Sequence, residues 1–314
     1  MSVKDEILLC PSCGSADYYK KGHTSNGEQR FKCKGCGSRF TRKSSLNGGG
    51  RTLKLPNIFV FDLENAPSKA AVWRMWKQNI YNDQITEEWY MLSWSGKWLY
   101  DTDIYSDVLT PDEAVNGDDA RIMTSLWDYI DAADILIGHN INQFDVLKMN
   151  TRFVVNGLKP PSPYQTIDTL LAARKNFSFT SNKLAYLCKQ FGVAQKADNG
   201  GMKRWLGCCD GNPQDLMDME HYNRQDIIAT EELYFAMRGW IKSHPNLALY
   251  MDNKIDACYK CGSPDIEWIK DKFYYTNVNK YSVYRCRECD SLGRSRHSSM
   301  AKQDRKFITS PIAR

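Results

Sequence analysis

The sequence has no long apolar run. Nowhere do its 314 residues approach the roughly 20 consecutive apolar residues that a membrane-spanning helix needs. The first residues, Met1 to Glu6, also lack the apolar stretch of a secretory signal. We therefore expect no membrane partner and a cytoplasmic location for this chain.

Acidic residues are scarce at both ends of the chain. Residues 1–57 carry 11 Lys and Arg against 4 Asp and Glu, and residues 254–314 carry 13 against 7. The middle has the opposite balance, with 18 basic and 26 acidic residues. This distribution predicts ends that meet a polyanion and a body that binds cations.

Cysteine is nearly absent from the middle, which contains only Cys188, Cys208 and Cys209 of the eleven. The other eight form four Cys-x-x-Cys pairs, two near each end, and the pairs are separated by 19 and by 24 residues. In a cytoplasmic chain this spacing favours zinc over disulfides, because four thiolates complete a tetrahedral shell around Zn²⁺. We predict two structural Zn²⁺ ions, the first with ligands Cys10, Cys13, Cys33 and Cys36, the second with Cys258, Cys261, Cys286 and Cys289.

The segment Asn57 to Asn65 predicts a buried strand that ends in two carboxylates, Asp62 and Glu64. Side chains two residues apart on a strand point to the same side, so these carboxylates project together. Like charges that are buried side by side need a cation between them, which predicts a divalent metal. A strand that ends in solvent would instead leave two surface acids.

The order of elements in the middle predicts an α/β fold with a mixed sheet. Strands are expected at Tyr90–Ser95 and Lys97–Tyr105, joined by a turn at Ser95-Gly96, and again at residues 135–138. Helices are expected to begin near residue 119 and at Pro213.

Three motifs in this body resemble those of a known enzyme superfamily. They are Asp62-x-Glu64, His139-Asn140-x-x-x-Phe144-Asp145 and Tyr222-x-x-x-Asp226. They are similar, in this order, to the exonuclease motifs of the DEDD superfamily, which has a ribonuclease H-like fold. The match is closest to phage-type 3′–5′ exonucleases related to the proofreading domain of family B DNA polymerases. It covers about residues 57–250.

The resemblance implies a site for two Mg²⁺ or Mn²⁺ ions that clamp the attacking and leaving oxygens of a phosphodiester. It implies that Asp62 bridges both ions and that Glu64 and Asp226 bind the ion on the nucleophile side. Asp145 would hold the other ion, mostly through water. A water molecule, and no side chain, is then the expected nucleophile.

Two residues compete for the role of orienting that water. The superfamily divides by a Tyr four residues, or a His five residues, before the last Asp, and this sequence has both, Tyr222 and His221. On a continuous helix the fourth residue back lies about 40° from Asp226 and the fifth about 140° away. The geometry favours Tyr222, unless the helix begins after His221.

Three further residues are candidates for contact with the substrate. Asn140 and Phe144 resemble positions that touch the terminal nucleotide in related exonucleases. Lys183 is a candidate phosphate contact, although a solvated lysine is the simpler interpretation. His139 is expected to be a capping or packed residue.

Both predicted zinc ribbons combine basic and aromatic residues, as nucleic-acid surfaces do. A hairpin with a small aromatic core would give the same pattern. The string from Cys10-Pro-Ser-Cys13 through Gln29-Arg30-Phe31-Lys32-Cys33 resembles the zinc ribbon of insertion-element transposases. Related phage exonucleases often end in a ribbon like the second, and usually lack the first.

The sequence thus predicts a metal-dependent 3′–5′ exonuclease acting on DNA 3′ ends, single-stranded or duplex, in the host cytoplasm if a phage encodes it. RNA remains a possible substrate, and a catalytically silent nucleic-acid-binding protein is the other alternative. The expected domains are a zinc ribbon at 1–43, a flexible linker at 44–53, the ribonuclease H-like domain at 54–250, a second ribbon at 251–296 and a basic tail at 297–314.

Overall fold

The computed structural model describes residues 18–23, 29–34, 39–41, 55–194, 200–251, 256–310 and 312. The chain divides into two compact units. One consists of residues 1–55 with 248–256, and the other of residues 56–247 with 257–314.

The first unit contains a small antiparallel sheet in the order β1-β2-β3. Its strands are β1 (Tyr18–His23), β2 (Gln29–Cys33) and β3 (Arg39–Thr41). Phe31 and Cys33 are buried, and the ring of Tyr18 meets that of Phe31 edge-on at 5.2 Å between centroids. Cys10, Cys13 and Cys36 lie outside the described residues, so the first zinc site stays a prediction.

The second unit is built around a five-stranded sheet in the order β10-β9-β4-β7-β8. The strands β10, β9 and β4 are parallel, whereas β7 and β8 run antiparallel to their neighbours, which confirms the predicted mixed sheet. The bounds are β4 (Ile58–Asn65), β7 (Met91–Trp98), β8 (Tyr105–Val108), β9 (Ile135–Gly138) and β10 (Gln165–Asp168).

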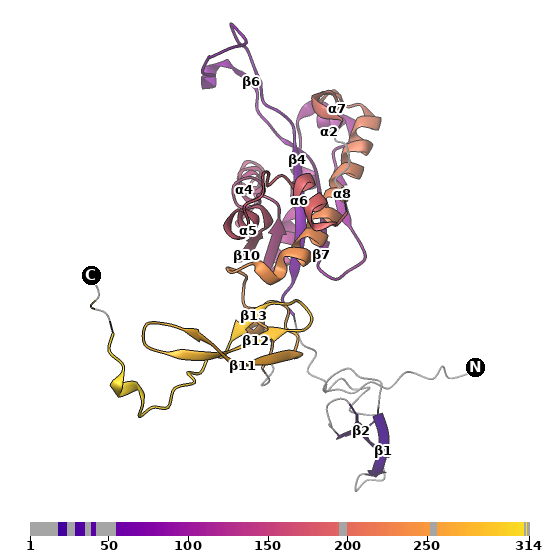
Figure 1. Cartoon of the computed structure of the whole chain (residues 1–314). Helices are drawn as coiled ribbons and strands as arrows, with labels where there is room; N and C mark the ends of the chain where they lie inside the picture. Colours follow the sequence, from indigo (N-terminus) through magenta and orange to yellow (C-terminus); the bar gives the residue numbers. More distant parts are fainter. Residues whose placement is uncertain are drawn as a thin grey trace, which may run out of the picture. The chain divides into compact units, whose positions relative to one another are not determined.

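Helices surround this sheet (Figure 1). The longest, α8, begins where the side chain of Asn212 accepts hydrogen bonds from the next N–H groups and Pro213 occupies the first turn. The helices are α2 (Pro111–Asn116), α3 (Ala120–Ala132), α4 (Asp145–Val155), α5 (Thr169–Asn176), α6 (Leu184–Phe191), α7 (Gly201–Cys209) and α8 (Pro213–Met237). Short 3₁₀ turns are η1 (Asn82–Gln84), η2 (Arg238–Trp240), η3 (Leu247–Leu249) and η4 (Arg305–Phe307). No helix in the described ranges is both long and apolar enough to cross a membrane.

The predicted turn at Ser95-Gly96 is wrong, because β7 continues through it to Trp98. Gly96 pairs with Phe61 of β4 and Tyr105 of β8. A Cβ atom at Gly96 would lie 2.2 Å from the ring of Phe59. This glycine therefore makes room for an aromatic ring in the middle of the sheet, and does not mark a chain reversal.

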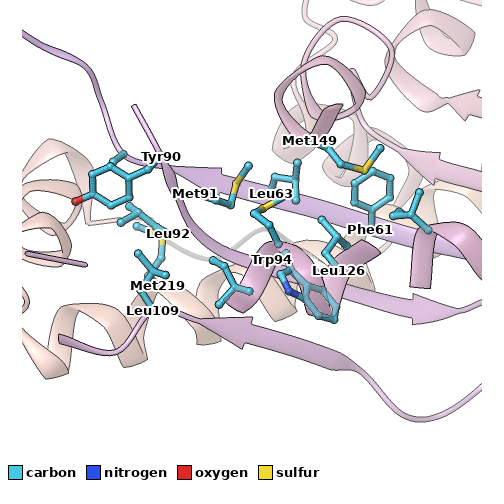
Figure 2. Close-up of a cluster of buried hydrophobic side chains, with 14 of the residues drawn as sticks. Phe61, Leu63, Tyr90, Met91, Leu92, Trp94, Leu109, Leu126, Met149 and Met219 are labelled. Atoms are coloured by element: carbon cyan, nitrogen blue, oxygen red, sulfur yellow. The ribbon is translucent and has the colours of Figure 1, made fainter. Parts of the chain in front are cut away.

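The two faces of β4 have different environments. Phe59, Phe61 and Leu63 belong to the main hydrophobic core, part of which Figure 2 shows. The ring of Phe59 stacks on Tyr129 of α3 at 5.2 Å between centroids. Because strand residues alternate, Asp62 and Glu64 point to the other face, and there Asn223 of α8 bonds to Asp62. The packed core on the first face fixes the direction of both carboxylates.

Two smaller sheets complete this unit. The strands β5 (Lys69–Ala70) and β6 (Ile85–Glu87), which lie between β4 and β7 in the sequence, pair with each other in an antiparallel sheet. Near the carboxyl end, β11 (Ile266–Tyr275), β12 (Lys280–Cys286) and β13 (Leu292–Arg294) form an antiparallel sheet in that order.

Candidate metal centre

Three carboxylates come together beside the central sheet. Asp62 and Glu64 are on β4, and Asp226 is on α8. One oxygen of each lies within 4.8 Å of the others. Asp226 is almost fully buried, whereas Asp62 and Glu64 are half-buried. The group therefore joins two elements that are distant in sequence, and its two members on β4 remain partly accessible to solvent.

Asp145 stands next to this group, at the first residue of α4. The strand β9 pairs with β4 only as far as Val60, and beyond that point the Leu63 N–H donates to Asp145 Oδ1 at 3.3 Å. The carboxyl of Asp145 is buried. Its burial, and then the nearby charge of Asp62, raise the pKa of Asp145 well above its ordinary value.

This raised pKa predicts a pH-dependent stability in protein that holds zinc but no Mg²⁺ or Mn²⁺. Asp145 favours folding while it is protonated, so its contribution is complete below the ordinary carboxyl pKa and is lost as pH rises through the raised value. We expect the free energy of unfolding in urea to fall as pH rises above about 4. Asp145→Asn should reduce that slope. An unchanged slope in this variant would contradict the assignment.

Adding Mg²⁺ to the wild type should weaken the same pH dependence, because a cation next to the carboxylates favours their charged form. The buffer is freed of divalent ions before it meets the protein, and no chelator is added, so that the tightly bound zinc stays in place during the comparison. Mg²⁺ should have no such effect on Asp145→Asn.

Three polar residues that the sequence motifs do not include lie beside the carboxylates, and one of them, Asn223, bonds to a carboxylate. The side-chain amide of Asn223 donates to Asp62 Oδ2 at 2.7 Å. Ser95 and Ser93 of β7 lie directly opposite Asp62 and Glu64, and both serines are fully buried. Asn223 is three residues before Asp226 and therefore shares its helix face. This spacing is visible in the sequence and could have identified Asn223 as a neighbour of the carboxylates.

Tyr222 and His221 lie on different sides of α8. The helix is continuous from Pro213, so His221 is in its interior and not before its start. Tyr222 is buried and its ring meets that of Trp205 edge-on at 6.3 Å between centroids. His221 is exposed, and its Nε2 accepts from Gln225 Nε2 at 2.7 Å. The buried face that carries Asp226 therefore also carries Tyr222.

The predicted substrate residues have different positions. Asn140 follows β9 with φ of 70°, and its N–H donates to Asp168 Oδ1 at 3.2 Å. Phe144 is partly exposed and directly precedes Asp145, so the turn between β9 and α4 holds both candidates close to Asp145 in the chain. Lys183 comes from another segment, is exposed, and precedes α6.

His139 is held by both ring nitrogens. Nδ1 is 2.9 Å from Thr169 Oγ1, and Nε2 is 3.0 Å from the Asn182 carbonyl oxygen. This arrangement fits the interpretation of His139 as a packed residue.

The second set of paired cysteines forms a compact cluster. Cys258, Cys261, Cys286 and Cys289 each place a sulfur within 4.8 Å of the others. The Sγ–Sγ distances are 3.6 Å for Cys258–Cys289 and 3.5 Å for Cys261–Cys286. Four sulfurs about 2.3 Å from a tetrahedral Zn²⁺ would be about 3.8 Å apart, so the cluster fits a zinc ribbon.

The donor atoms distinguish the two metal sites. The carboxylate group offers only hard oxygen ligands, which suit Mg²⁺ and Mn²⁺, whereas the four thiolates suit Zn²⁺. Both sets of residues fit the ions that the sequence predicts for them.

The family comparison matches the same part of the chain. Residues 99–238 match the model of the RNase_H superfamily. The central domain has an RNase H-like fold. The match includes Asp145 and Asp226 but begins after β4. Asp62 and Glu64 lie outside the match, and it is the structure that places them next to Asp226. An RNase H-like fold with an acidic group that could hold a metal ion supports nuclease activity on nucleic acid.

Other comparisons are more limited. Residues 7–37 match the zinc ribbon model of the InsA N-terminal domain. Among solved structures, the family B DNA polymerase of the hyperthermophilic archaeon Pyrobaculum calidifontis is similar over 59% of this chain, with 13% identity and a TM-score of 0.40. The alignment spans 26% of that polymerase. The curated proteins contain no match.

Proposed function

We propose that this chain is a metal-dependent 3′–5′ exonuclease that shortens DNA from its 3′ end. The observation that carries the proposal is the group of Asp62, Glu64 and Asp226, whose oxygens approach within 4.8 Å inside an RNase H-like domain. Such a concentration of negative charge next to a phosphodiester would repel the substrate unless cations are bound. The 3′–5′ direction rests on the motif resemblance alone.

In the proposed reaction, Asp62, Glu64, Asp145 and Asp226 would hold two Mg²⁺ or Mn²⁺ ions, which when bound would supply activation of a water molecule and stabilisation of the leaving oxygen. The water oxygen forms a bond to the terminal phosphorus, the bond from phosphorus to the 3′ oxygen of the preceding nucleotide breaks, and that oxygen takes up a proton. A 5′-mononucleotide leaves, and the shortened strand has a new 3′ hydroxyl.

The remaining assignments belong to the same proposal. The Tyr222 hydroxyl orients the attacking water, Asn140 and Phe144 contact the terminal nucleotide, and Lys183 contacts a phosphate. Zinc ribbons at residues 1–43 and 251–296 bind the nucleic acid, with the linker 44–53, the nuclease domain 54–250 and the basic tail 297–314 completing the order.

A digestion series tests the activity and its substrate. Labelled single-stranded DNA, duplex DNA and RNA are each incubated with the full chain and Mg²⁺ or Mn²⁺, with and without a chelator. We expect DNA to be degraded only when the ion is present. Degradation of RNA alone would replace the DNA assignment, and the absence of degradation of all three would contradict the proposal.

Tyr222→Phe and His221→Ala separate the two candidates for the water. Tyr222→Phe should lower kcat about 100-fold, because the hydroxyl that orients the water is lost while the packed ring remains. His221→Ala should leave kcat within about twofold, since this side chain is exposed on another side of α8. The opposite pattern in single-turnover assays would assign the role to His221.

A further inference from the structure

A projecting arm, residues 66–89, presents large apolar side chains to solvent. It leaves the sheet immediately after β4 and returns to β7, and in Figure 1 it extends away from the sheet at the label β6. Its tip, residues 72–81, includes Trp73, Met75 and Trp76, with exposed fractions of 96%, 86% and 78%. Ile80 and Tyr81 are also more than half exposed. Contiguous exposed apolar side chains of this size mark an interaction site.

Hydrogen bonds define the stem of the arm. The Ala66 N–H donates to the Tyr90 carbonyl and the Ala71 N–H to the Gln84 carbonyl, both at 2.8 Å. The Gln84 side chain donates back to the Ala71 carbonyl at 3.1 Å. At the base, Lys69 pairs with Glu87 at 2.7 Å.

The tip has a local turn of its own. The Arg74 guanidinium donates to the Lys77 carbonyl at 3.0 Å, and the Gln78 side chain donates to the Arg74 carbonyl. Lys77 has a positive φ of 48°. The side chains of Arg74 and Gln78 thus each donate one bond to a backbone carbonyl of the turn, while the rings of Trp73 and Trp76 are left in solvent.

The charge of the tip indicates what it binds. Between Val72 and Tyr81 there are two cations, Arg74 and Lys77, and no acidic residue. Aromatic rings stack on bases, and interleaved cations meet the phosphates, which together form a platform for single strands. A surface built to bind a basic or neutral protein would not need this balance.

The position of the base of the arm indicates how a nucleic-acid strand could run between the carboxylates and the tip. Ala66 is two residues after Glu64, so the arm starts at the carboxylate group. From Ala66 to Trp76 the chain advances ten residues, which reach at most about 33 Å. If the bases of a single strand stay stacked at the duplex rise of about 3.4 Å, this reach corresponds to at most about ten nucleotides.

We propose that residues 72–81 form a stacking platform for single-stranded nucleic acid, several nucleotides from the 3′ end that the carboxylates hold. The platform binds bases through Trp73, Trp76 and Tyr81, and phosphates through Arg74 and Lys77. It gives affinity without sequence preference, because every base has a face on which a ring can stack. The inference rests on the proposed function for the position of the 3′ end, but not for binding itself.

Equilibrium binding without cleavage tests the platform. Full-length Asp226→Asn protein is the background, and the probes are fluorescent single-stranded DNA of about 20 nucleotides and a tetranucleotide of the same sequence. The arm variant Trp73→Ala/Trp76→Ala/Tyr81→Ala should bind the longer probe about 10-fold or more weakly, because several stacked bases are lost. Binding of the tetranucleotide should stay within about twofold, since four stacked nucleotides extend about 14 Å, less than half of the maximum reach of the arm.

Two further variants strengthen the test. Trp240→Ala removes a tryptophan that is 61% exposed outside the arm, and it should bind both probes like the background protein. Arg74→Ala/Lys77→Ala should reduce the slope of log affinity against log salt by about 1.4, because two phosphate contacts are lost. Circular dichroism checks that each variant is folded.

Unchanged binding of the longer probe by the arm variant would overturn the inference. So would a concentration-dependent dimer, measured by sedimentation, that the arm variant abolishes, since the tip would then bind a second copy of the chain. Selective loss of binding to anionic vesicles would assign it to a lipid surface. If the wild type binds through the arm but cleaves no nucleic acid, the proposed function fails and the platform stands.

Discussion

Asp62→Asn should lower the rate of DNA cleavage by at least about 1,000-fold, or about 4 kcal/mol of transition-state stabilisation. Asp62 is linked to all three of the other carboxylates. It belongs to the group with Glu64 and Asp226, and its charge contributes to the raised pKa of Asp145. The substitution keeps the size of the side chain and an oxygen that accepts from Asn223. The charge needed to hold a cation is removed.

The same substitution should leave the protein as stable as the wild type or more stable. In metal-free protein Asp62 repels neighbouring carboxylates, and its neutral replacement removes that repulsion. A loss of activity that accompanies a preserved or higher midpoint of urea unfolding separates a chemical role from a structural one. Asp101→Asn, at an exposed position outside the group, is the matched control and should be active. Full activity in Asp62→Asn would remove the metal site from the mechanism.

Cys258→Ser should release one Zn²⁺ per chain and unfold the sheet β11-β12-β13. Small zinc domains have little core of their own, and the ion contributes about 10–16 kcal/mol of apparent binding energy. Among the residues that the structure describes, the hydrophobic cluster around Cys258 has just two other buried members, Tyr284 and Cys286. Without the fourth sulfur, we expect proteases to cut between residues 256 and 294 while the RNase H-like domain stays intact.

The matched control is Cys208→Ser, the same change at a fully buried cysteine in the main core. It should keep all of its zinc, although a hydroxyl in this core lowers the unfolding free energy by about 1–3 kcal/mol. Zinc is counted by mass spectrometry of the purified, dialysed proteins. Equal zinc contents in the wild type and in Cys258→Ser would contradict the zinc ribbon.

Much of the candidate site follows from local rules that a sequence contains. The spacing of Asp62 and Glu64 on a strand predicts that they share a side, and their oxygens do lie together. Helix periodicity likewise predicts that Tyr222, and not His221, shares the buried face of Asp226. Asn223 satisfies the same rule, but it has no charge and belongs to none of the motifs, so only the structure identifies its bond to Asp62.

Other features depend on contacts between distant segments. No spacing rule predicts that Asp226 lies near β4. Its position depends on the packing of α8 against the sheet, which includes the ion pair of Lys97 with Glu231. Gly96 has the local signature of a turn, yet the ring of Phe59 decides its conformation. The arm has no clear periodicity of apolar residues. A tryptophan in such a segment could equally be buried, and only the structure shows that Trp73 and Trp76 are exposed.

The direction and metal dependence of cleavage test the central claim most directly. Single-stranded DNA labelled at its 5′ end is incubated with the full chain and Mn²⁺, and the products are separated by length over time. We predict a ladder of labelled fragments that shorten one nucleotide at a time, and no products from Asp226→Asn or without Mn²⁺. Immediate release of the labelled 5′ nucleotide, or equal cleavage by Asp226→Asn, would contradict a 3′–5′ exonuclease built on these carboxylates.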